Sequence, residues 1–559
     1  MSDETLSFNL VDEPWVRVRT LAGKEVELSL LEVFRQASTI ERLANDLPTQ
    51  DFAILRMLLA ILQRSIMERL DDCEFVSDAW GDLWDVGELP IDKIEAYLGA
   101  WHHRLDLFDS EMPFMQVAGL HAVNNSISEV KKLIADVPDG TPLFSIKALG
   151  GLDYFERGEA ARWLVHVHAF DTSGIKTGVV GDASVKGGKS YPIGTGWAGN
   201  LGGVYLEGSN LTDTLLLNLV LCIDCQELDD EPISEDDLPT WEQPPKEPGD
   251  DLRVPQGYAD LYTWQSRRVL LCHDEVKVTG VILTNGDKLD AYNKVSIEPM
   301  TSWRRSQNQE KKLGIVPVYL PRTHSIGKAI WRGLTSILPQ MDTDEHPGVQ
   351  PPGIMRWVGR LSSIEGGYRL SKDYVLKTHA VGLVYGTQNS VVTELVDDEM
   401  FVHAFLLSKE GRLAASLAKR CMKNTEEAVE RALGNYVMKL RLAAGDESKR
   451  AEGVRDLAKA QAYFELDAPF RSWLFSLEAT TDLVQAEDRW NRQAYEIVRA
   501  IAQRLVEEAG PEAVVGRKVK FGKAEEWISV GRAENQFVYW LGKTLPYAKE
   551  SIPQMEKES

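Results

Sequence analysis

A short polar tetrad interrupts an apolar stretch in VGLVYGTQNSVVTELV, residues 381–396. The tetrad Thr-Gln-Asn-Ser, 387–390, follows a strand-like run, and an apolar pattern with helical spacing resumes at Val391. Side-chain amides both donate and accept hydrogen bonds, so this junction has the chemistry to read polar groups on a binding partner. A turn that caps a following helix through Asn389 or Ser390 uses the same residues, and the two roles are compatible.

A second stretch with chemical potential is ASVKGGKS, 183–190, which fits a relaxed phosphate-loop pattern with Ala183 in place of the first glycine. A phosphate loop lies between a buried strand and a helix, whose N-terminus faces the phosphates. Here Tyr191, Pro192 and Gly194 follow, and they do not begin a helix at the right place. A nucleotide-binding hydrolase that uses residues 183–190 is therefore kept only as the alternative function.

Glycine is dense between residues 174 and 203, where ten glycines and one acid accompany Lys176, Lys186 and Lys189. Within this segment GTGWAG, 194–199, spells G-x-G-x-x-G, but no apolar strand precedes it and no helix follows. A dinucleotide site is therefore not expected. The segment is either a flexible surface loop or a backbone that approaches a nucleic-acid groove closely, because no Cβ stands in the way.

Cysteine and histidine provide two weak metal-site patterns. Cys222 and Cys225 form a lone C-x-x-C, and Cys-His at 272–273 offers further ligand types. Because Cys222 ends an apolar run and no second C-x-x-C occurs, we predict buried free thiols rather than a zinc site. His166 and His168 are expected to share one face of a strand and to be structural. No protease, serine hydrolase or kinase motif occurs, and we predict no enzyme, cofactor or metal ion.

A basic cluster lies in SWRRSQNQEKKLG, 302–314, where Arg304, Arg305 and two lysines accompany Trp303. Basic side chains beside an aromatic ring suit contact with phosphate and stacking on a base. A solvated run of charge is the alternative, and the sequence does not decide between the two. We carry Arg304 and Arg305 forward as candidate phosphate contacts.

The composition is that of a folded protein with a strong negative charge. The formal charge is −23 with 43% hydrophobic residues, which argues against free, non-specific binding to nucleic acid. Residues 381–559 account for only −3 of this charge, so a local basic patch can still bind DNA, above all if partner subunits add positive charge. Five cysteines, no visible secretory signal and no membrane-length apolar run predict a cytoplasmic protein.

The elements that must position these residues predict an α+β fold in two domains. Residues 1–390 are expected to form a large mixed domain, with two strands around the turn 22–24 and a helix over 51–70 that has Asp51 as N-cap. Residues 391–559 show 3.6-residue periodicity with short breaks. We predict an all-α C-terminal four-helix bundle, with helices within 391–443, 447–480, 485–509 and 532–549.

Several segments occur in an informative order along the chain. They are FNLVDEPWVRVR at 8–19, MPFMQV at 112–117, GGVYLEGSNLTDTLLLNLVL at 202–221 and LPTWEQP at 238–244, followed by the polar tetrad and the helical bundle. Together they resemble the CasA family, the large subunit of the type I-E CRISPR surveillance complex Cascade. The resemblance covers essentially the whole chain, and it rests on the collinearity of the segments rather than on any one of them.

The resemblance implies a non-catalytic subunit that recognises the protospacer-adjacent motif (PAM) in double-stranded DNA. It also implies a role in initial unwinding and R-loop formation, and in recruiting a helicase–nuclease. The implied partners are the other Cascade subunits with the CRISPR RNA, the target duplex and that nuclease. Such a subunit leaves most sequence reading to the RNA, so it need not be basic overall.

Transferred residue by residue, the wedge that the family inserts beneath the PAM corresponds to Gly386, Thr387, Gln388 and Asn389. The family's Asn-Gln order appears here as Gln388-Asn389, so which amide contacts DNA stays open. The chemistry is suitable, because the minor groove offers mainly acceptors and the guanine amino group, and amides pair with both.

The resemblance also implies a PAM lysine, a glycine loop and a docking phenylalanine. The lysine corresponds to Lys294 in AYNKVSIEPMTSW, with an ordinary surface lysine at the start of a strand as the alternative. The glycine loop corresponds to Gly194 and Gly196, although the spacing is longer than in the family and Gly199 competes. The phenylalanine that docks on the RNA-bearing core corresponds to Phe144, with a core residue as the alternative.

Overall fold

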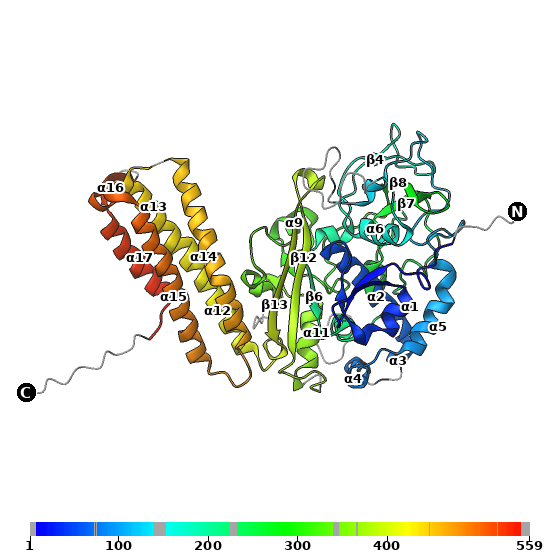
Figure 1. The fold of residues 1–559 in the computed structure, drawn as a ribbon, viewed down its shortest axis with the longest axis horizontal. Helices are drawn as coiled ribbons and strands as arrows, with labels where there is room; N and C mark the ends of the chain where they lie inside the picture. The colour runs from blue at the N-terminus through cyan, green and yellow to red at the C-terminus, as the bar shows by residue number, and fades with distance from the viewer. Residues whose placement is uncertain are drawn as a thin grey trace, which may run out of the picture. The chain divides into compact units, whose positions relative to one another are not determined.

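The fold was analysed on a computed structural model. It describes residues 7–71, 73, 75–135, 137, 153–222, 232–338, 346–364, 367–446, 448–521 and 524–548. The chain divides into two compact units. The first comprises Met1–Lys328, Asp342–Met400 and Leu407–Lys409, and the second Ala329–Met341, Phe401–Leu406 and Glu410–Ser559. Mixed helix and sheet in the first unit and helices in the second confirm the predicted α+β class (Figure 1).

The first unit combines short helices with small antiparallel sheets. Its helices are α1 Leu30–Arg35, α2 Pro48–Ser65, α3 Met67–Asp71, α4 Val76–Val86, α5 Ile91–Trp101, α6 Arg157–Phe170, α7 Leu211–Asn218, α8 Tyr258–Tyr262, α9 Gln307–Leu313 and α11 Gly353–Leu361. Its strands are β1 Val16–Thr20, β2 Glu25–Leu28, β3 Ile40–Leu43, β4 Lys176–Thr177, β5 Lys189–Ser190, β6 Gly203–Glu207, β7 Arg267–His273, β8 Val278–Asn285, β9 Trp303–Arg305, β10 Tyr319–Pro321, β11 Val349–Gln350 and β12 Val375–Tyr385, with β13 Val392–His403 beginning in this unit.

The sheet that matters most for function has the strand order β13–β12–β6. β12 pairs with β6 in antiparallel register from Lys377 opposite Glu207 to Val381 opposite Gly203. The apolar run of β12 is almost wholly buried, which is why it forms a central strand between two neighbours. α2, α7 and a 3₁₀ turn at Trp197–Asn200 pack beside this sheet. The long hairpin β12–β13 is therefore supported on a packed core.

The N-terminal elements confirm part of the prediction. The strands β1 and β2 flank the predicted turn, where Gly23 has a φ of 77°. The predicted helix over 51–70 is present as α2, but the proposed N-cap is wrong. Pro48 opens the helix, and Asp51 lies within its first turn. Its carboxylate instead accepts hydrogen bonds from the backbone and side-chain amides of Asn45, at 2.8 and 2.7 Å.

Asp51 gives a measurable pH dependence. Burial raises its pKa from 3.8 to about 6, against the lowering effect of the Asn45 hydrogen bonds. Between these two pH values the unfolded chain has lost the proton while the folded chain keeps it, so stability falls as pH rises from about 4 to about 6 and then levels. Relative to Asp51→Asn, we expect the wild-type free energy of unfolding to fall by on the order of 3 kcal/mol over this window. Urea unfolding at a series of pH values checks this; parallel curves for the two proteins would contradict it.

The two histidines near residue 167 are structural, as predicted, but they lie in helix α6 rather than on a strand. The helix is mostly buried, as its apolar and alanine residues favour. His166 Nε2 is 3.0 Å from Thr49 Oγ1, and His168 Nε2 is 2.9 Å from the Met115 carbonyl. Burial lowers the pKa of His166 to about 3 and that of His168 to about 4, so both rings are neutral at physiological pH.

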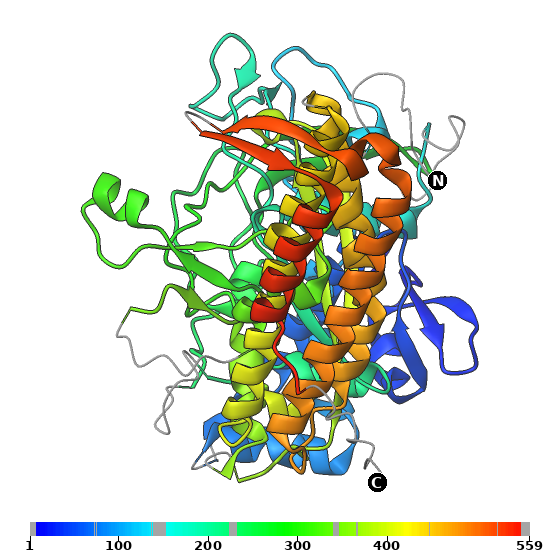
Figure 2. The ribbon, with the colours of Figure 1, turned by 90° about the vertical axis from the view of Figure 1, so that its left-hand side faces the viewer.

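The second unit contains the predicted helical bundle (Figures 1 and 2). Its elements are α10 Leu334–Ile337, α12 Arg412–Glu427, a π-helical turn Ala428–Leu433, α13 Gly434–Ala444, α14 Lys449–Phe475, α15 Leu483–Glu508, α16 Gly510–Val515, β14 Arg517–Phe521, β15 Ala524–Ile528 and α17 Val530–Thr544. α12 and α13 form one long helix through the π turn. With α14, α15 and α17 it makes the four-helix bundle.

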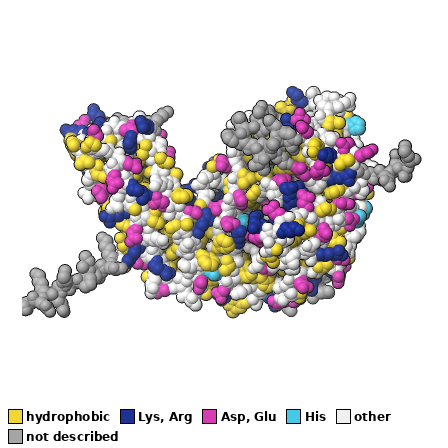
Figure 3. All heavy atoms as spheres, viewed as in Figure 1, with side chains coloured by type: hydrophobic (Ala, Val, Ile, Leu, Met, Phe, Trp, Pro, Cys, Tyr) yellow, Lys and Arg dark blue, Asp and Glu magenta, His cyan; other side chains and the backbone are white. Residues whose placement is uncertain are grey.

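Two features of this region were not predicted correctly. Helix was expected from residue 391, but residues 392–403 form strand β13 and the first bundle helix begins at Arg412. The β14–β15 hairpin was not predicted; Val519 on β14 and Ile528 on β15 are its buried apolar residues. No helix among the described residues is long and apolar enough to cross a membrane. On the face in Figure 3, side chains of both charge signs are interspersed.

Candidate nucleic-acid interface

The polar tetrad forms the tip of the β12–β13 hairpin. β12 ends at Tyr385, and the Gly386 N–H donates to the Val391 carbonyl at 2.8 Å. The Asn389 N–H donates back to the Gly386 carbonyl at 3.0 Å, which closes the turn. A strand follows, so the expected helix cap through Asn389 or Ser390 is wrong. The alternative in which these residues lie at an exposed turn is supported, because the side chains of 387–390 are all exposed.

The tip has an unusual backbone. Gln388 and Asn389 have φ values of 57° and 55°, in the left-handed region. Asparagine tolerates this conformation, but glutamine rarely adopts it, and such a residue costs about 1–3 kcal/mol unless the surroundings enforce it. The strain is confined to the two amide-bearing residues. A functional role for these side chains is the physical hypothesis that such an outlier supports.

Two long-range hydrogen bonds hold the tip against the segment that follows α6. The Tyr385 hydroxyl donates to the Phe170 carbonyl at 2.6 Å, and the Ser173 N–H donates to the Asn389 carbonyl at 2.8 Å. Both contacts use backbone acceptors, so they fix the course of the chain and leave the Gln388 and Asn389 amides unconstrained. The tip is therefore an anchored turn with exposed amide groups.

A buried ion cluster brings the glycine-rich segment to the same place. Asp171 binds the Arg267 guanidinium and lies 2.5 Å from Lys176 Nζ. Burial acts to raise the pKa of Asp171, but these two cations outweigh it and the pKa is lowered. Arg267 also donates to the Gly194 carbonyl at 2.8 Å, and the Gly196 N–H donates to the Asp171 carbonyl at 2.9 Å. The cluster thus joins residues 194–196 to the anchor of the hairpin tip.

The two glycines assigned to the PAM loop differ in what they require. Gly194 has a φ of 115°, and a Cβ added there meets no atom within 4 Å. Its backbone is open, as close approach to a groove requires. Gly196 is instead packed on the end of α6, where an added Cβ would lie 2.5 Å from the Ala169 carbonyl. Gly199 is likewise packed, against the Tyr385 ring. Of the three, only Gly194 combines open space with a glycine conformation.

Gly196→Ala is expected to lower the free energy of unfolding by about 1–3 kcal/mol, because the new methyl group overlaps backbone that cannot move independently of α6. Urea unfolding measures the change. Gly453→Ala is the matched control: Gly453 lies within α14 with nothing within 4 Å of an added Cβ. There alanine should raise stability by about 0.5–1 kcal/mol. Equal effects at the two positions would show that Gly196 is not sterically required.

Lys294 lies at the start of a turn, not of a strand. The N–H groups of Ile297 and Glu298 both donate to its carbonyl, at 3.1 and 2.9 Å. The side chain is half-buried, and burial lowers its pKa against the opposing effect of Asp290. Glu298, which ends the turn, accepts a hydrogen bond from Trp197 Nε1 at 2.7 Å. The Lys294 turn is thereby tied to the 3₁₀ turn of the glycine-rich segment.

The other predicted contacts are more dispersed. Arg304 is exposed on β9. Arg305 donates to both oxygens of Glu310, at 2.6 and 3.3 Å, so its guanidinium is already engaged within the chain. Arg304 is the better candidate for a phosphate contact. Phe144 lies outside the described residues.

The structure contradicts the patterns for nucleotide binding and for free thiols. Residues 183–188 belong to the loop between β4 and β5, and residues 189–190 are β5 itself, which pairs with β4 and is not followed by a helix. The phosphate-loop geometry is therefore absent, which removes the basis for the hydrolase alternative. Cys222 is disulfide-bonded, so its prediction as a free thiol is wrong, and Cys225 lies outside the described residues. Cys272 is free, as predicted, but it is half-buried rather than buried. Within the described part of the chain, no group of three or more potential metal ligands occurs.

Sequence reasoning located the tip but missed the residues that hold it. Tyr385 belonged to the stretch that drew attention, yet nothing local shows that its hydroxyl reaches Phe170. Ser173, Asp171 and Arg267 carry no sequence motif. Arg267 gave one usable signal, because a charged residue at a position that a strand buries must find a partner.

The chain is thus an α+β protein of two units: a mixed unit, which carries the anchored, amide-tipped hairpin and the glycine-rich segment, and a second unit, which contains the four-helix bundle. The sequence model of the family described as CRISPR-associated protein Cse1 matches residues 9–501. The chain belongs to this family, whose members are also named CasA, and the resemblance found in the sequence is confirmed.

Individual relatives agree with this assignment. CasA/Cse1 of Thermus thermophilus is 30% identical over 343 residues, which are 60% of this chain and 60% of the relative's length. The solved structure of Thermobifida fusca Cse1 is 40% identical with a TM-score of 0.87, and the match covers 98% of this chain and 100% of that one. A chain of a CRISPR RNA-guided surveillance complex shares the fold at 19% identity and a TM-score of 0.63, covering 90% and 99% of the two chains.

Proposed function

We propose that the chain is the non-catalytic large subunit of an RNA-guided surveillance complex, Cascade, and that it recognises the PAM in double-stranded DNA. In this role it starts unwinding and R-loop formation and helps recruit a helicase–nuclease. Its partners are the other Cascade subunits with the CRISPR RNA, the target duplex and the nuclease. Membership of the Cse1 family and the surveillance complex that contains a chain of this fold support the assembly.

The observation that carries the proposal is the anchored hairpin tip. A wedge that separates base pairs must resist displacement, and here a strained turn is held by hydrogen bonds to Phe170 and Ser173. It must also form hydrogen bonds with the polar base edges that become exposed when the base pairs separate. The side chains of Gln388 and Asn389 are exposed amides that can donate and accept such bonds. Rigid backbone and free amides together favour a reading and separating element over an ordinary loop.

The neighbouring elements suit the remaining steps. Gly194 lies in an open stretch of backbone tied to the same anchor, so it can approach a narrow groove. Lys294 supplies one positive charge from a turn that is bound to the glycine-rich segment through Glu298 and Trp197. Arg304 is available for phosphate. Sparse positive charge fits a subunit that binds DNA only within a larger complex, since charge-driven binding is sequence-independent and would hold a basic free chain on any DNA.

A gel-shift titration tests the proposal. The RNA-containing complex is titrated on a PAM-bearing and a PAM-mutated target duplex, without the chain, with it, and with its Lys294→Ala variant. We expect PAM-dependent binding only when the chain is present, and a weaker preference with the variant. If the chain joins the complex and binding stays independent of the PAM, the proposed recognition is wrong. If it does not join, the assembly itself is wrong.

A further inference from the structure

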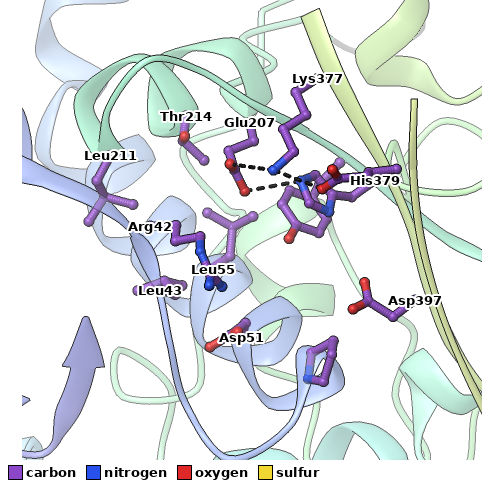
Figure 4. Close-up of a pocket in the computed structure, with 13 residues that line it drawn as sticks. Arg42, Leu43, Asp51, Leu55, Glu207, Leu211, Thr214, Lys377, His379 and Asp397 are labelled. Atoms are coloured by element: carbon purple, nitrogen blue, oxygen red, sulfur yellow. Dashed lines mark hydrogen bonds and ion pairs between the residues drawn. The ribbon is translucent and has the colours of Figure 1, made fainter. Parts of the chain in front are cut away.

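A cavity of about 270 Å³ lies within the first unit, beside the sheet β13–β12–β6 (Figure 4). Its walls come from β3, α2, β6, α7, β12 and β13, and they carry both carboxylates and cations. A cavity needs only about 10–15 Å³ of such space to hold one water, so this one has room for several waters or for one small organic molecule. None of the hairpin-tip residues contributes to it.

Two of the carboxylates in the cavity have partners within the chain. Lys377 Nζ lies 3.0 Å from Glu207 and 2.8 Å from Glu399, and His379 Nε2 lies 3.0 Å from the second oxygen of Glu207. Burial acts to raise the pKa of Glu207, but His379 and Lys377 outweigh it, and the pKa is lowered. This side of the cavity is a closed ion network (Figure 4).

The other two carboxylates have no such counter-charge. Asp51 receives its two hydrogen bonds from Asn45 on one oxygen, Oδ1, and no described residue donates to Oδ2. The Asp397 side chain is exposed at the edge of the cavity, and it has neither a hydrogen bond nor an ion pair with the described residues. Arg42 attracts both from a distance that is too long for an ion pair. Figure 4 shows Asp51 on α2 and Asp397 on β13 lining the same cavity.

A third polar group in the wall also has no partner. The Tyr205 ring stacks on His379, with 4.6 Å between the ring centroids and 9° between their planes, so its position is fixed. No described residue forms a hydrogen bond with its hydroxyl, and burial raises its pKa well above the ordinary value, so the hydroxyl stays protonated. The side chain is half-buried, and a protonated hydroxyl without a partner in the chain is available to donate a hydrogen bond to a ligand in the cavity.

These features select the chemistry of a ligand. Four carboxylates face the cations of Arg42 and Lys377, so the lining favours a positive charge. No cluster of three or more metal-ligating side chains occurs among the described residues, and the two unpaired carboxylates come from different elements. Spaced acceptors suit a group with several N–H donors rather than a bare ion. We propose that this cavity binds a small organic cation, with a primary ammonium or guanidinium group held between Asp51 and Asp397.

The proposal does not depend on DNA recognition, and the test uses the full chain without nucleic acid. Isothermal titration at about pH 8 with putrescine and with methylguanidine is compared with butanediol, the uncharged analogue of putrescine. We expect saturable one-to-one binding of at least one cation and no binding of the diol. Binding of neither cation, or equal binding of the diol, would overturn the proposal.

Variants locate the site. Asp51→Asn keeps a carbonyl oxygen for the Asn45 donors, and Asp397→Asn changes a position without internal contacts. Each should weaken cation binding at least about tenfold, since each removes a charged hydrogen-bond acceptor. Glu394→Gln is the matched control, because Glu394 is an exposed acid on the same strand but outside the cavity lining. Unchanged affinity in both aspartate variants, with circular dichroism showing native fold, would place the cation elsewhere and refute the assignment.

Discussion

Replacing Glu298 with alanine is expected to lower the free energy of unfolding of the first unit by about 3–5 kcal/mol. Both partners of the Arg56–Glu298 pair are buried, with side chains 2% and 0% exposed. Glu298 accepts from two guanidinium nitrogens at 2.8 Å each and from Trp197 at 2.7 Å. Without the carboxylate, a guanidinium stays buried beside an unpaired indole N–H. Urea unfolding followed by far-ultraviolet circular dichroism measures the loss.

Two controls separate the buried charge from simple truncation. Arg35→Ala breaks an exposed ion pair with Glu95, at 2.6 Å and with side chains 51% and 37% exposed, and should cost about 1 kcal/mol or less. The double variant Arg56→Met/Glu298→Leu removes both charges and keeps apolar volume. It should recover much of the stability lost in Glu298→Ala, because no charge is left unpaired. A cost of Glu298→Ala equal to that of Arg35→Ala would show that this pair is not tightly packed.

This ion pair illustrates what the sequence could not reveal. Arg56 and Glu298 are 242 residues apart, and no local pattern connects them. The apolar positions of α2 correctly predicted its helix, but they left Arg56 as one charged residue on an apolar face. A pairing of this kind depends on how helix α2 and the 294–298 turn meet in space. The local periodicity of the sequence carries no information about how these two elements pack together.

The bundle and the hairpin also differ in how far local sequence pattern determines their structure. Ala- and Leu-rich segments with breakers such as Gly445, which has a φ of 90°, predicted the bundle helices correctly because each helix buries one periodic face. Residues 391–403 also have apolar residues at helical spacing, and there the prediction is wrong. Val391, Val392 and Thr393 are β-branched, and pairing with β12 supplies hydrogen bonds that a helix would otherwise provide. Pairing with β12 therefore determines that residues 392–403 form a strand rather than a helix.

For the candidate site, exposure was predictable and anchoring was not. A polar tetrad between two apolar runs is expected to reach solvent, and Gln388 and Asn389 do so. Their left-handed backbone and the bonds from Ser173 and Tyr385 depend on residues that carry no motif. The sequence therefore identified the residues of the tip, and the fold shows the hydrogen bonds that hold the tip in place.

Replacing both Gln388 and Asn389 with glycine should weaken PAM-dependent binding of duplex DNA by the complex at least about tenfold. Glycine accepts φ values near 57° and 55° without strain, so the turn is preserved and only the two amides are lost. The anchor from Ser173 uses the Asn389 carbonyl, which glycine retains. An amide that pairs with base edges contributes about 1–3 kcal/mol of discrimination, or about ten- to hundredfold in affinity. Gel-shift titration with PAM-bearing duplex measures the effect.

Two further variants make the result specific to the amides. Asn125 is another exposed residue with a left-handed backbone, at a φ of 54°, so Asn125→Gly repeats the substitution at a different loop and should leave binding unchanged. Exchanging the order, Gln388→Asn/Asn389→Gln, keeps two amides on the same turn. Retained binding in the exchanged protein would mean that amide chemistry suffices, whereas loss would mean that each position reads its own group. Wild-type binding by the double-glycine protein, with its unfolding free energy within about 1 kcal/mol of wild type, would remove the tip from PAM recognition and leave the glycine-rich segment and Lys294 as the elements to test.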